Sequence, residues 1–442
     1  MFAGCGAKYE ARNGNLDTSK DVVITVAGAW TDFKALDVIG QEFSKVFPNC
    51  TVEYEYLQNY VDTSVKRLGS QGDNIDLFMT DNIQEDSPYI PYALELTGQS
   101  DKLDLSQTFE GMIKNFTISG SNELYAVPIG SKVRGMFVNK TLLDKFGISM
   151  PTNKDELLAA AKTLADEGYI PFHGNPGLFA QQLAYPAVAN VIAHAEDYEA
   201  TYDMVNSCDE EAAELFREPL EFLYTIMENK YYNYKYVENE LNMFVNTDDH
   251  YLATDFLGIK DDGNGNATVD EVGTVAFMPA AASLQTVMAT TKEDYHSNVE
   301  YEFVLAPITD EGGVAYLSPG KGIAVNKNSD DLDWALEFMN FFFTEQYNKE
   351  FAEASNLLPN TSDAVEYAAE AFGVPKEQIC ELGEVTFDYG FYGMIVVPMT
   401  DIVKGNNPKY MKDDGKGNLS LYDFEHYMDL LKSAFATQRG AN

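Results

Sequence analysis

The chain has 442 residues, of which 45% are hydrophobic and 23% charged, a composition typical of a globular protein with enough apolar residues for two hydrophobic cores. Its 70 acidic and 30 basic side chains give a net charge of −40, which excludes nucleic acid as a partner because a polyanion is repelled by such a surface. No run of about 18 apolar residues is present, so no membrane-spanning helix is predicted.

The first six residues read MFAGCG. They are similar to the end of a bacterial lipoprotein signal, in which small residues precede a cysteine that receives the lipid, and this predicts lipidation of Cys5. The alternative is an accidental Ala-Gly-Cys sequence at a terminus. Residues 6–20 are polar and lack periodicity, so a flexible tether is expected there.

The remaining cysteines are Cys50, Cys208 and Cys380. Their number is odd, they are widely separated, and no CxxC spacing occurs, which argues against a zinc site and against a disulfide framework. We therefore expect buried thiols, no bound metal and no cofactor.

The first elements follow a β-α-β-α-β order. Apolar runs predict strands over residues 22–26, 51–57 and 75–79, and the segments between them predict a helix that ends at Pro48 and a polar helix over about 62–68. This order is typical of an open α/β sheet, whose ligands lie beyond the carboxyl ends of the strands.

Those strand ends are followed by an aromatic side chain and short carboxylates. Trp30 and Asp32 follow the first strand, and Asp81 follows the third. A sugar stacks its C–H face on an aromatic ring and needs acceptors and donors for its hydroxyls, so these residues are candidate sugar ligands. The alternatives are a core or rim position for Trp30 and helix N-capping by the two aspartates.

Residues 124–172 predict strand, turn, strand, helix, a break at Pro151, helix and strand. Short apolar runs with Gly and Pro punctuation suit strands that cross a domain boundary. The segment also carries Lys132 and Arg134, and the loop that follows it carries His173 and Asn175 as further candidate ligands. A lone histidine is more often structural, and the two cations could instead pair with acidic surface groups.

The rest of the chain predicts helices over residues 178–246, whose tyrosines pack a second core, and strands over 272–278, ending at Pro279, and over 301–306. A later helix places Trp334 in a core. The stretches 261–266 and 413–418 fail the EF-hand ligand pattern and predict tight turns. Residues 387–393 read FDYGFYG.

The order of several short motifs carries a family resemblance. Residues 125–128 (YAVP), 137–140 (FVNK), 146–148 (FGI), 151–152 (PT) and 170–172 (IPF) resemble the extracellular solute-binding proteins of ABC importers, most closely the carbohydrate-binding, maltose-binding-protein-like group. The resemblance implies a periplasmic-binding-protein-like α/β fold in which two lobes on crossover hinge strands enclose a ligand cleft. It implies an N-terminal lobe of residues 21–129 plus 315–358 and a C-terminal lobe of 130–314 plus 359–442, after a lipid-anchor remnant and tether over 1–20.

In functional terms the resemblance implies a monomeric lipoprotein, not an enzyme, on the extracellular face of a bacterial membrane, or in the periplasm if an outer membrane exists. It would capture an oligosaccharide or sugar derivative and deliver it to an ABC permease. In the family a C-terminal aromatic often completes the sugar platform, so Tyr389 and Tyr392 are candidates. Lys132 stands where the family's maltose binder has a glutamate that contacts the ligand, so an acidic or sulfated sugar is an option.

Two other functions stay open at this point. The same fold could bind a polyamine, a metal or a peptide, because a stacking residue customary in the family is replaced by the run 280–283 (AAAS). A secreted glycoside hydrolase would need two carboxylates flanking the scissile bond, and Asp32 with Asp81 could supply them.

Overall fold

The computed structural model describes residues 9–14, 16–28, 34–70, 74–80, 83–118, 121–174, 176–232, 249–261, 267–317, 319–381, 411–416 and 418–439. The chain divides into two compact units, which we call unit 1 (residues 1–132 and 317–368) and unit 2 (residues 133–316 and 369–442). The sequence placed the corresponding lobe boundaries at 129/130, 314/315 and 358/359.

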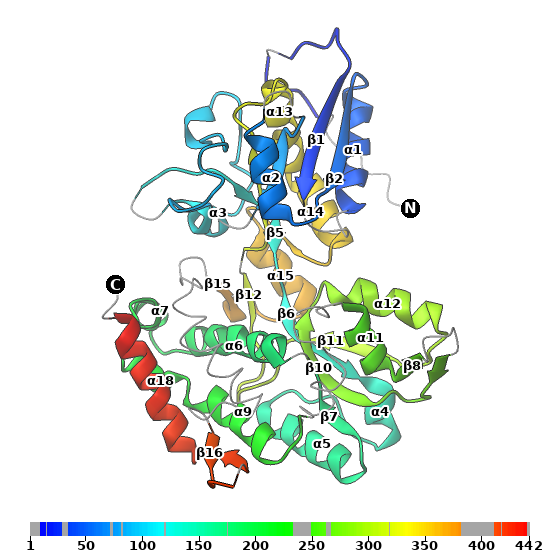
Figure 1. Ribbon diagram of the computed structural model, residues 1–442, viewed down its shortest axis with the longest axis vertical. Helices are drawn as coiled ribbons and strands as arrows, with labels where there is room; N and C mark the ends of the chain where they lie inside the picture. The colour runs from blue at the N-terminus through cyan, green and yellow to red at the C-terminus, as the bar shows by residue number, and fades with distance from the viewer. Residues whose placement is uncertain are drawn as a thin grey trace. The chain divides into compact units, whose positions relative to one another are not determined.

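Unit 1 contains a five-stranded sheet in the order β2-β1-β3-β13-β4, of which Figure 1 labels the neighbouring strands β1 and β2. The strands are β1 (Val22–Gly28), β2 (Cys50–Tyr56), β3 (Leu77–Thr80), β4 (Val127–Pro128) and β13 (Gly322–Val325), with a small ladder of β5 (Gly130–Ser131) and β14 (Leu358–Pro359). The helices are α1 (Lys34–Val46), α2 (Tyr60–Leu68), η1 (Thr97–Gln99), α3 (Glu110–Phe116), α13 (Leu332–Phe342) and α14 (Glu345–Ala354).

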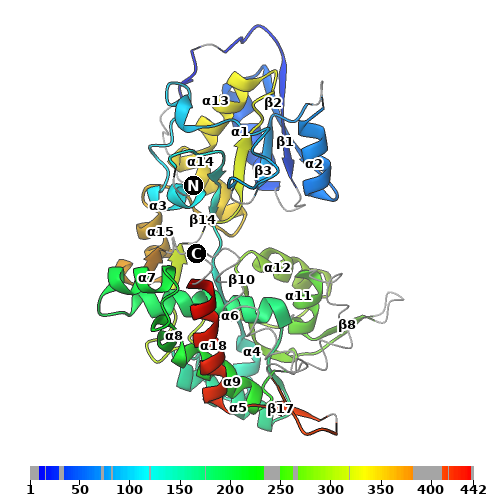
Figure 2. The same cartoon turned by 60° about the vertical axis from the view of Figure 1, so that its left-hand side comes forward.

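The predicted β-α-β-α-β start of the chain is confirmed. β1 pairs in parallel with both β2 and β3, whereas β13 pairs antiparallel to β3 and β4. Helix α1 packs its apolar side, with Phe43, against α13, where Trp334 is 4% exposed and meets the Phe43 ring edge-on at 6.5 Å. The expected core position of Trp334 is therefore confirmed, and Figure 2 shows α1 and α13 beside the unit 1 sheet.

Unit 2 is built on a four-stranded sheet in the order β11-β6-β10-β7. Its strands are β6 (Arg134–Asn139), β7 (Ile170–Phe172), β10 (Val275–Ala281) and β11 (Tyr301–Val304), with two hairpins, β8 (Ile259–Asp261) with β9 (Ala267–Val269) and β16 (Met411–Asp413) with β17 (Leu419–Leu421). Two further elements contain unit boundaries: β12 (Ala315–Leu317), which pairs with β15 (Ile379–Glu381), and α15 (Ala364–Phe372).

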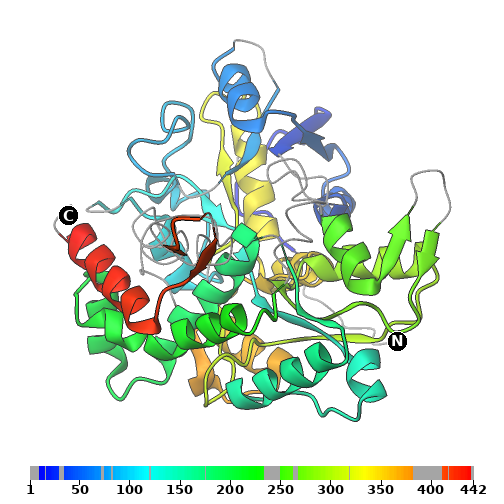
Figure 3. The same ribbon diagram turned by 60° about the horizontal axis from the view of Figure 1, so that its bottom comes forward.

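The helices of unit 2 pack around this sheet, and the buried apolar residues of the described part form two hydrophobic clusters. These helices are α4 (Lys140–Lys145), α5 (Lys154–Asp166), α6 (Pro176–Ala193), α7 (Tyr198–Asn206), α8 (Ala212–Leu215), α9 (Arg217–Glu228), α11 (Asp249–Leu257), α12 (Leu284–Asp294), η2 (Lys376–Gln378) and α18 (Phe424–Arg439). Tyr231 and Tyr232 are buried in one of these clusters and Tyr224 packs against it, as predicted. The last helix, α18 (red in Figure 3), lies along α8 and α9.

One strand runs further than its sequence indicates. The sequence predicts a strand over residues 272–278 that ends in Pro279-Ala280-Ala281, whereas in the structure β10 stays paired through Pro279 as far as Ala281 and places Pro279 opposite Met136 of β6. Its other neighbour, β7, pairs only as far as Phe277, so the proline lies beyond the β7 ladder, where a missing N–H costs no hydrogen bond on that side.

The N-terminal segment departs from the expected flexible tether. Glu337 of α13 is fully buried and accepts hydrogen bonds from the Tyr9 hydroxyl (2.7 Å) and from the backbone N–H groups of Arg12 (3.0 Å) and Asn13 (2.9 Å). The Tyr9 ring also packs edge-on against Phe341 at 5.0 Å. Residues 9–13 are thus part of unit 1, because the hydrogen bonds to a buried carboxylate and the ring contacts of Tyr9 compensate the entropy lost on ordering them.

The predicted tight turn at 413–418 is confirmed. The Asp414 carboxylate accepts the backbone N–H groups of Lys416 (2.8 Å) and Asn418 (3.1 Å) and the Asn418 side-chain amide (2.7 Å). These contacts, with the Asn418 side chain first among them, lower the pKa of Asp414. The carboxylate therefore serves the turn itself. Residues 262–266 of the second predicted turn lie outside the described residues.

Candidate functional site

Most of the site residues predicted from sequence, which are ligand contacts and the lipidation site Cys5, lie outside the described residues. They are Cys5, Trp30, Asp32, Asp81, Asn175, Tyr389 and Tyr392. The structure does describe the strand ends that precede three of them, as well as Lys132, Arg134 and His173.

The carboxyl edge of the unit 1 sheet is a topological switch point. Because β2 and β3 flank β1 on opposite sides and all three run parallel, the connections that leave β1 and β3 diverge at this edge, which is where open α/β sheets bind ligands. Residues 29–33 follow β1 and residues 81–82 follow β3.

Tyr60, the first residue of α2, ties these two strand ends together. Its hydroxyl contacts the carbonyl oxygen of Met79 in β3 and lies 3.2 Å from that of Ala27 in β1. Ser64, one turn later, donates to the Tyr60 carbonyl oxygen at 2.6 Å and so fixes the helix end. The two chain segments that carry Trp30, Asp32 and Asp81 therefore begin next to strand ends that the same Tyr60 hydroxyl contacts.

An aromatic residue at this edge escaped the sequence analysis. Tyr56 is the last residue of β2, pairs in register with Gly28 of β1, and is 47% exposed. Large exposed aromatic side chains at a ligand-binding edge are suited to stacking on sugars. The sequence did contain a signal for this residue, because a tyrosine stands at the carboxyl end of the predicted strand 51–57.

In unit 2, Arg134 begins β6 and is half-buried. Its guanidinium carbon lies 4.1 Å from the centroid of the Tyr185 ring of α6. Tyr316 of β12 is 1% exposed beside them, and its burial raises the pKa of its hydroxyl, with a smaller opposing effect from Arg134. Lys132, two residues before Arg134, is also half-buried but belongs to unit 1.

His173 follows β7 and has no exposed surface. Its Nε2 atom lies 2.9 Å from Oδ2 of Asp255 in α11, and its backbone N–H donates to the carbonyl oxygen of Phe277 at 3.2 Å. These contacts give the imidazole a structural position between β7, β10 and α11. Its role as a ligand remains a prediction.

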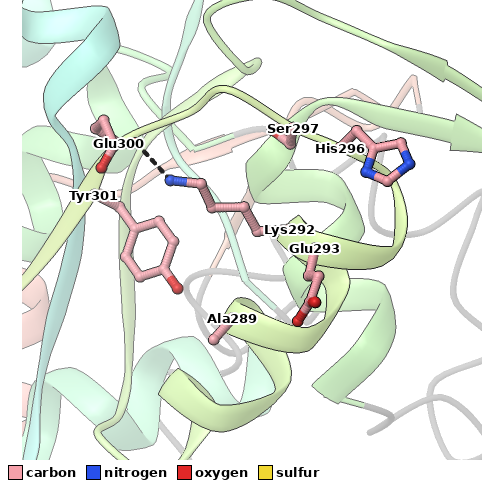
Figure 4. Close-up of a pocket in the computed structure, with 7 residues that line it drawn as sticks. All are labelled: Ala289, Lys292, Glu293, His296, Ser297, Glu300 and Tyr301. Carbon is pink, nitrogen blue, oxygen red and sulfur yellow. Dashed lines mark hydrogen bonds and ion pairs between the residues drawn. The ribbon is translucent and has the colours of Figure 1, made fainter.

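A separate hollow of about 520 Å³ lies in unit 2 between α12 and β11, lined by Ala289, Lys292, Glu293, His296, Ser297, Glu300 and Tyr301 (Figure 4). The Lys292 ammonium points at Glu300 and lies 2.6 Å from Oε1, and the same nitrogen is 5.9 Å from the centre of the Tyr301 ring. The Lys292 ammonium is thus already paired with the Glu300 carboxylate within the hollow, so it is a poor candidate for binding a charged ligand.

The described residues contain no group of three or more histidine, cysteine, aspartate or glutamate side chains placed to hold a metal ion. Within the same residues, no helix has the length and apolarity to cross a membrane. Cys50, Cys208 and Cys380 are buried thiols, as expected, and burial raises the pKa of Cys50 to about 12, with smaller contributions from Asp331 and Asp76.

Comparison with known proteins extends this picture. The chain is 24% identical over 207 residues to the melibiose/raffinose/stachyose-binding protein MelE of Bacillus subtilis, a match that spans 44% of this chain and 46% of that relative's length. Its fold is similar to the GacH receptor of Streptomyces glaucescens, solved unliganded and with acarbose (17% identity, TM-score 0.63, covering 95% of this chain and 99% of that one).

A second solved structure is the ABC-transporter binding protein BlMnBP1 of Bifidobacterium animalis subsp. lactis in complex with mannobiose. It shares 16% identity at a TM-score of 0.60 and covers 98% of this chain and 100% of its own. The two-lobed α/β fold expected from sequence is confirmed by these neighbours. Residues 27–349, most of the chain, match the model of the bacterial extracellular solute-binding protein family, and the chain therefore belongs to that family of binding proteins.

Proposed function

We propose that this protein is the carbohydrate-binding component of an ABC importer, which captures an oligosaccharide or sugar derivative and passes it to a membrane permease without chemical change. The observation that carries the proposal is the switch point of the unit 1 sheet. At this edge the Tyr60 hydroxyl contacts the ends of both β1 and β3, the strands that precede Trp30, Asp32 and Asp81. The chain also belongs to a family of solute-binding proteins.

The proposed ligand contacts combine aromatic and polar groups. Trp30 and Tyr56 provide stacking surfaces, and Asp32 and Asp81 accept hydrogen bonds from sugar hydroxyls. Asn175 and one of Tyr389 and Tyr392 add contacts from unit 2, with His173 as a more buried candidate. The proposed lobes remain those bounded at 129/130, 314/315 and 358/359. Ligand contacts from both would stabilise a closed form.

The proposed location is the outer face of a bacterial membrane, where a lipid on Cys5 would hold a monomer beside its permease. A family of bacterial extracellular proteins supports this location, and the similarity of residues 1–6 to a lipoprotein signal supports the anchor. Two acyl chains, as in a diacylglyceryl cysteine, would anchor more firmly than one.

Tryptophan fluorescence tests the binding site directly, because Trp30 and Trp334 are the only two tryptophans. In a Trp334→Phe variant, Trp30 is the sole tryptophan, and we expect its emission to change in a saturable manner on titration with the bound saccharide. A thermal-shift screen over raffinose, stachyose, mannobiose, maltose oligomers and uronate oligomers identifies that saccharide, because a ligand at 100 times its Kd stabilises by ~2.7 kcal/mol.

Three results would contradict the proposal. A screen in which no saccharide shifts the unfolding temperature would remove carbohydrate as the ligand. Release of reducing ends from an oligosaccharide by the purified protein would favour the glycoside hydrolase alternative. A shift with polyamines, metal ions or peptides alone would retain the fold and replace the ligand.

A further inference from the structure

Among the residues that the structure describes, Arg134 has no carboxylate partner, although the chain has a large excess of acidic groups. The other arginines whose side chains are described, Arg12, Arg67 and Arg217, each contact an aspartate or glutamate. Among the described residues no carboxylate lies within ion-pair distance of Arg134, although the chain carries 70 acidic and 30 basic side chains. A half-buried guanidinium with no acidic partner among the described residues is suited to binding an acid from outside.

The guanidinium is also held in a fixed place. Tyr185 lies under it at 4.1 Å, and a guanidinium over a ring face keeps its in-plane N–H donors directed away from the ring. The backbone is equally constrained, since Arg134 pairs with Ala281 of β10 and the neighbouring Val133 carbonyl oxygen accepts the N–H of Ala282 at 2.9 Å. Such fixed donors match the two oxygens of a carboxylate.

Two buried polar atoms of unit 2 have no hydrogen-bond partner among the described residues. The hydroxyl of Tyr316, which interacts electrostatically with both Arg134 and Tyr185, has no hydrogen-bond partner within the described chain. The same is true there of Oε1 of Gln182, a 7% exposed residue three positions before Tyr185 and hence on the same side of α6. Buried polar atoms normally have partners, so such a pair points to a polar group supplied from outside.

We propose that Arg134, Tyr185 and Tyr316 form an anion-recognising subsite of unit 2 that binds a carboxylate of the saccharide, so that the ligand is an acidic sugar such as a uronic acid-containing oligosaccharide. Arg134 donates to the carboxylate oxygens, Tyr185 holds the guanidinium in orientation, and the Tyr316 hydroxyl donates to an adjacent oxygen of the ligand. The inference rests on the proposed function and narrows its ligand class.

The test compares matched acidic and neutral saccharides by calorimetric titration of the full chain. Oligomers of galacturonate, glucuronate-containing disaccharides and oligomers of mannuronate are each paired with the neutral oligomer of galactose, glucose or mannose. We expect the best acidic ligand to bind about 10- to 100-fold more tightly than its neutral counterpart. Raising the salt concentration should weaken only the acidic ligand.

Four variants assign the effect to the subsite. Arg134→Gln should remove the preference for the acidic ligand, and Arg134→Lys should retain part of it because the charge stays but the planar fork is lost. Tyr316→Phe should leave thermal stability equal or higher, since its hydroxyl has no hydrogen-bond partner among the described residues, yet it should weaken acidic binding several-fold. The control is Arg217→Gln, which removes an arginine of unit 2 already paired with Glu214 and Glu425 and should leave binding unchanged.

The possible outcomes separate this inference from the function it rests on. Tight binding of neutral saccharides alone, or an equal loss of neutral and acidic binding in Arg134→Gln, overturns the acidic subsite and leaves carbohydrate binding standing. A panel in which neither class binds contradicts the proposed function itself. Preference for the acidic ligand that persists in Arg134→Gln also overturns the assignment.

Discussion

A single hydroxyl holds the two strand ends that precede the candidate sugar ligands of unit 1. We expect Tyr60→Phe to remove the contacts with the carbonyl oxygens of Ala27 and Met79 and to lower the free energy of unfolding by about 1 kcal/mol. Saccharide affinity should also fall several-fold, although the variant stays folded. The reason is that the segments with Trp30 and Asp81 begin at those two strand ends, so a small displacement of the ends misplaces the ligand contacts. Calorimetric titration and urea unfolding measure the two effects.

The matched control for Tyr60→Phe is Tyr347→Phe, which deletes a hydroxyl from α14 in the same unit while keeping the ring that stacks on Phe341 at 3.9 Å. We expect its saccharide affinity to equal that of the parent protein. An unchanged affinity in Tyr60→Phe would show that the strand ends do not depend on this hydroxyl.

A buried carboxylate fastens the N-terminal segment to unit 1. We expect Glu337→Gln to weaken the bonds from Tyr9, Arg12 and Asn13 and to cost about 1–3 kcal/mol of unfolding free energy, because an amide replaces one of the two acceptor oxygens and leaves a buried donor without its partner. Amide hydrogen exchange at residues 12 and 13 should speed up. Glu350→Gln, an exposed site on α14, should leave exchange unchanged; equally slow exchange in both variants would argue against the fastening role.

At the scale of elements, Cys50 is the buried first residue of β2, and its thiol is expected to make the free energy of unfolding decrease at alkaline pH. Burial raises the pKa of the Cys50 thiol from 9.0 to about 12. The folded state thus favours the neutral thiol, and the resulting stability is complete below about pH 9 and is lost as the pH rises toward about 12. Between about pH 8 and pH 10 the loss should be about 1.4 kcal/mol.

Urea unfolding at these two pH values checks this prediction. Cys50→Ala should be less stable than the parent at both pH values because a buried side chain is shortened, but its unfolding free energy should fall less with pH. A parallel decline in both proteins would assign the alkaline loss to other groups, among them Tyr427, whose pKa burial also raises to about 12.

Elements were predictable from sequence where periodicity and punctuation agree. The strands and helices from Val22 to Thr80 follow the predicted β-α-β-α-β order within two or three residues, because each apolar run is bounded by a clear turn. The pattern could not reveal the docking of Tyr9 or the extension of β10 beyond Pro279, since both depend on partners distant in sequence. It also could not reveal the stacking of Arg134 on Tyr185.

At the scale of the whole molecule, a solute-binding protein should become more compact when its ligand joins both lobes. We expect small-angle scattering to show a smaller radius of gyration with the saccharide selected by the thermal-shift screen than without it. Tyr60→Phe should show the same compaction at a higher saccharide concentration, since the substitution weakens binding and lies outside the predicted hinge segment, residues 124–172. A radius of gyration that stays unchanged at a saturating ligand concentration would contradict closure of the lobes, but it would not contradict ligand binding.

Isothermal titration calorimetry of the purified chain with the selected saccharide tests the central claim most directly, because it distinguishes capture from conversion. Capture of a sugar by a transport protein predicts a saturable heat with one ligand per chain, a return to baseline after each injection, and an unchanged saccharide at the end. The absence of saturable heat with every saccharide of the panel, or a sustained heat that accompanies cleavage of the sugar, would contradict it.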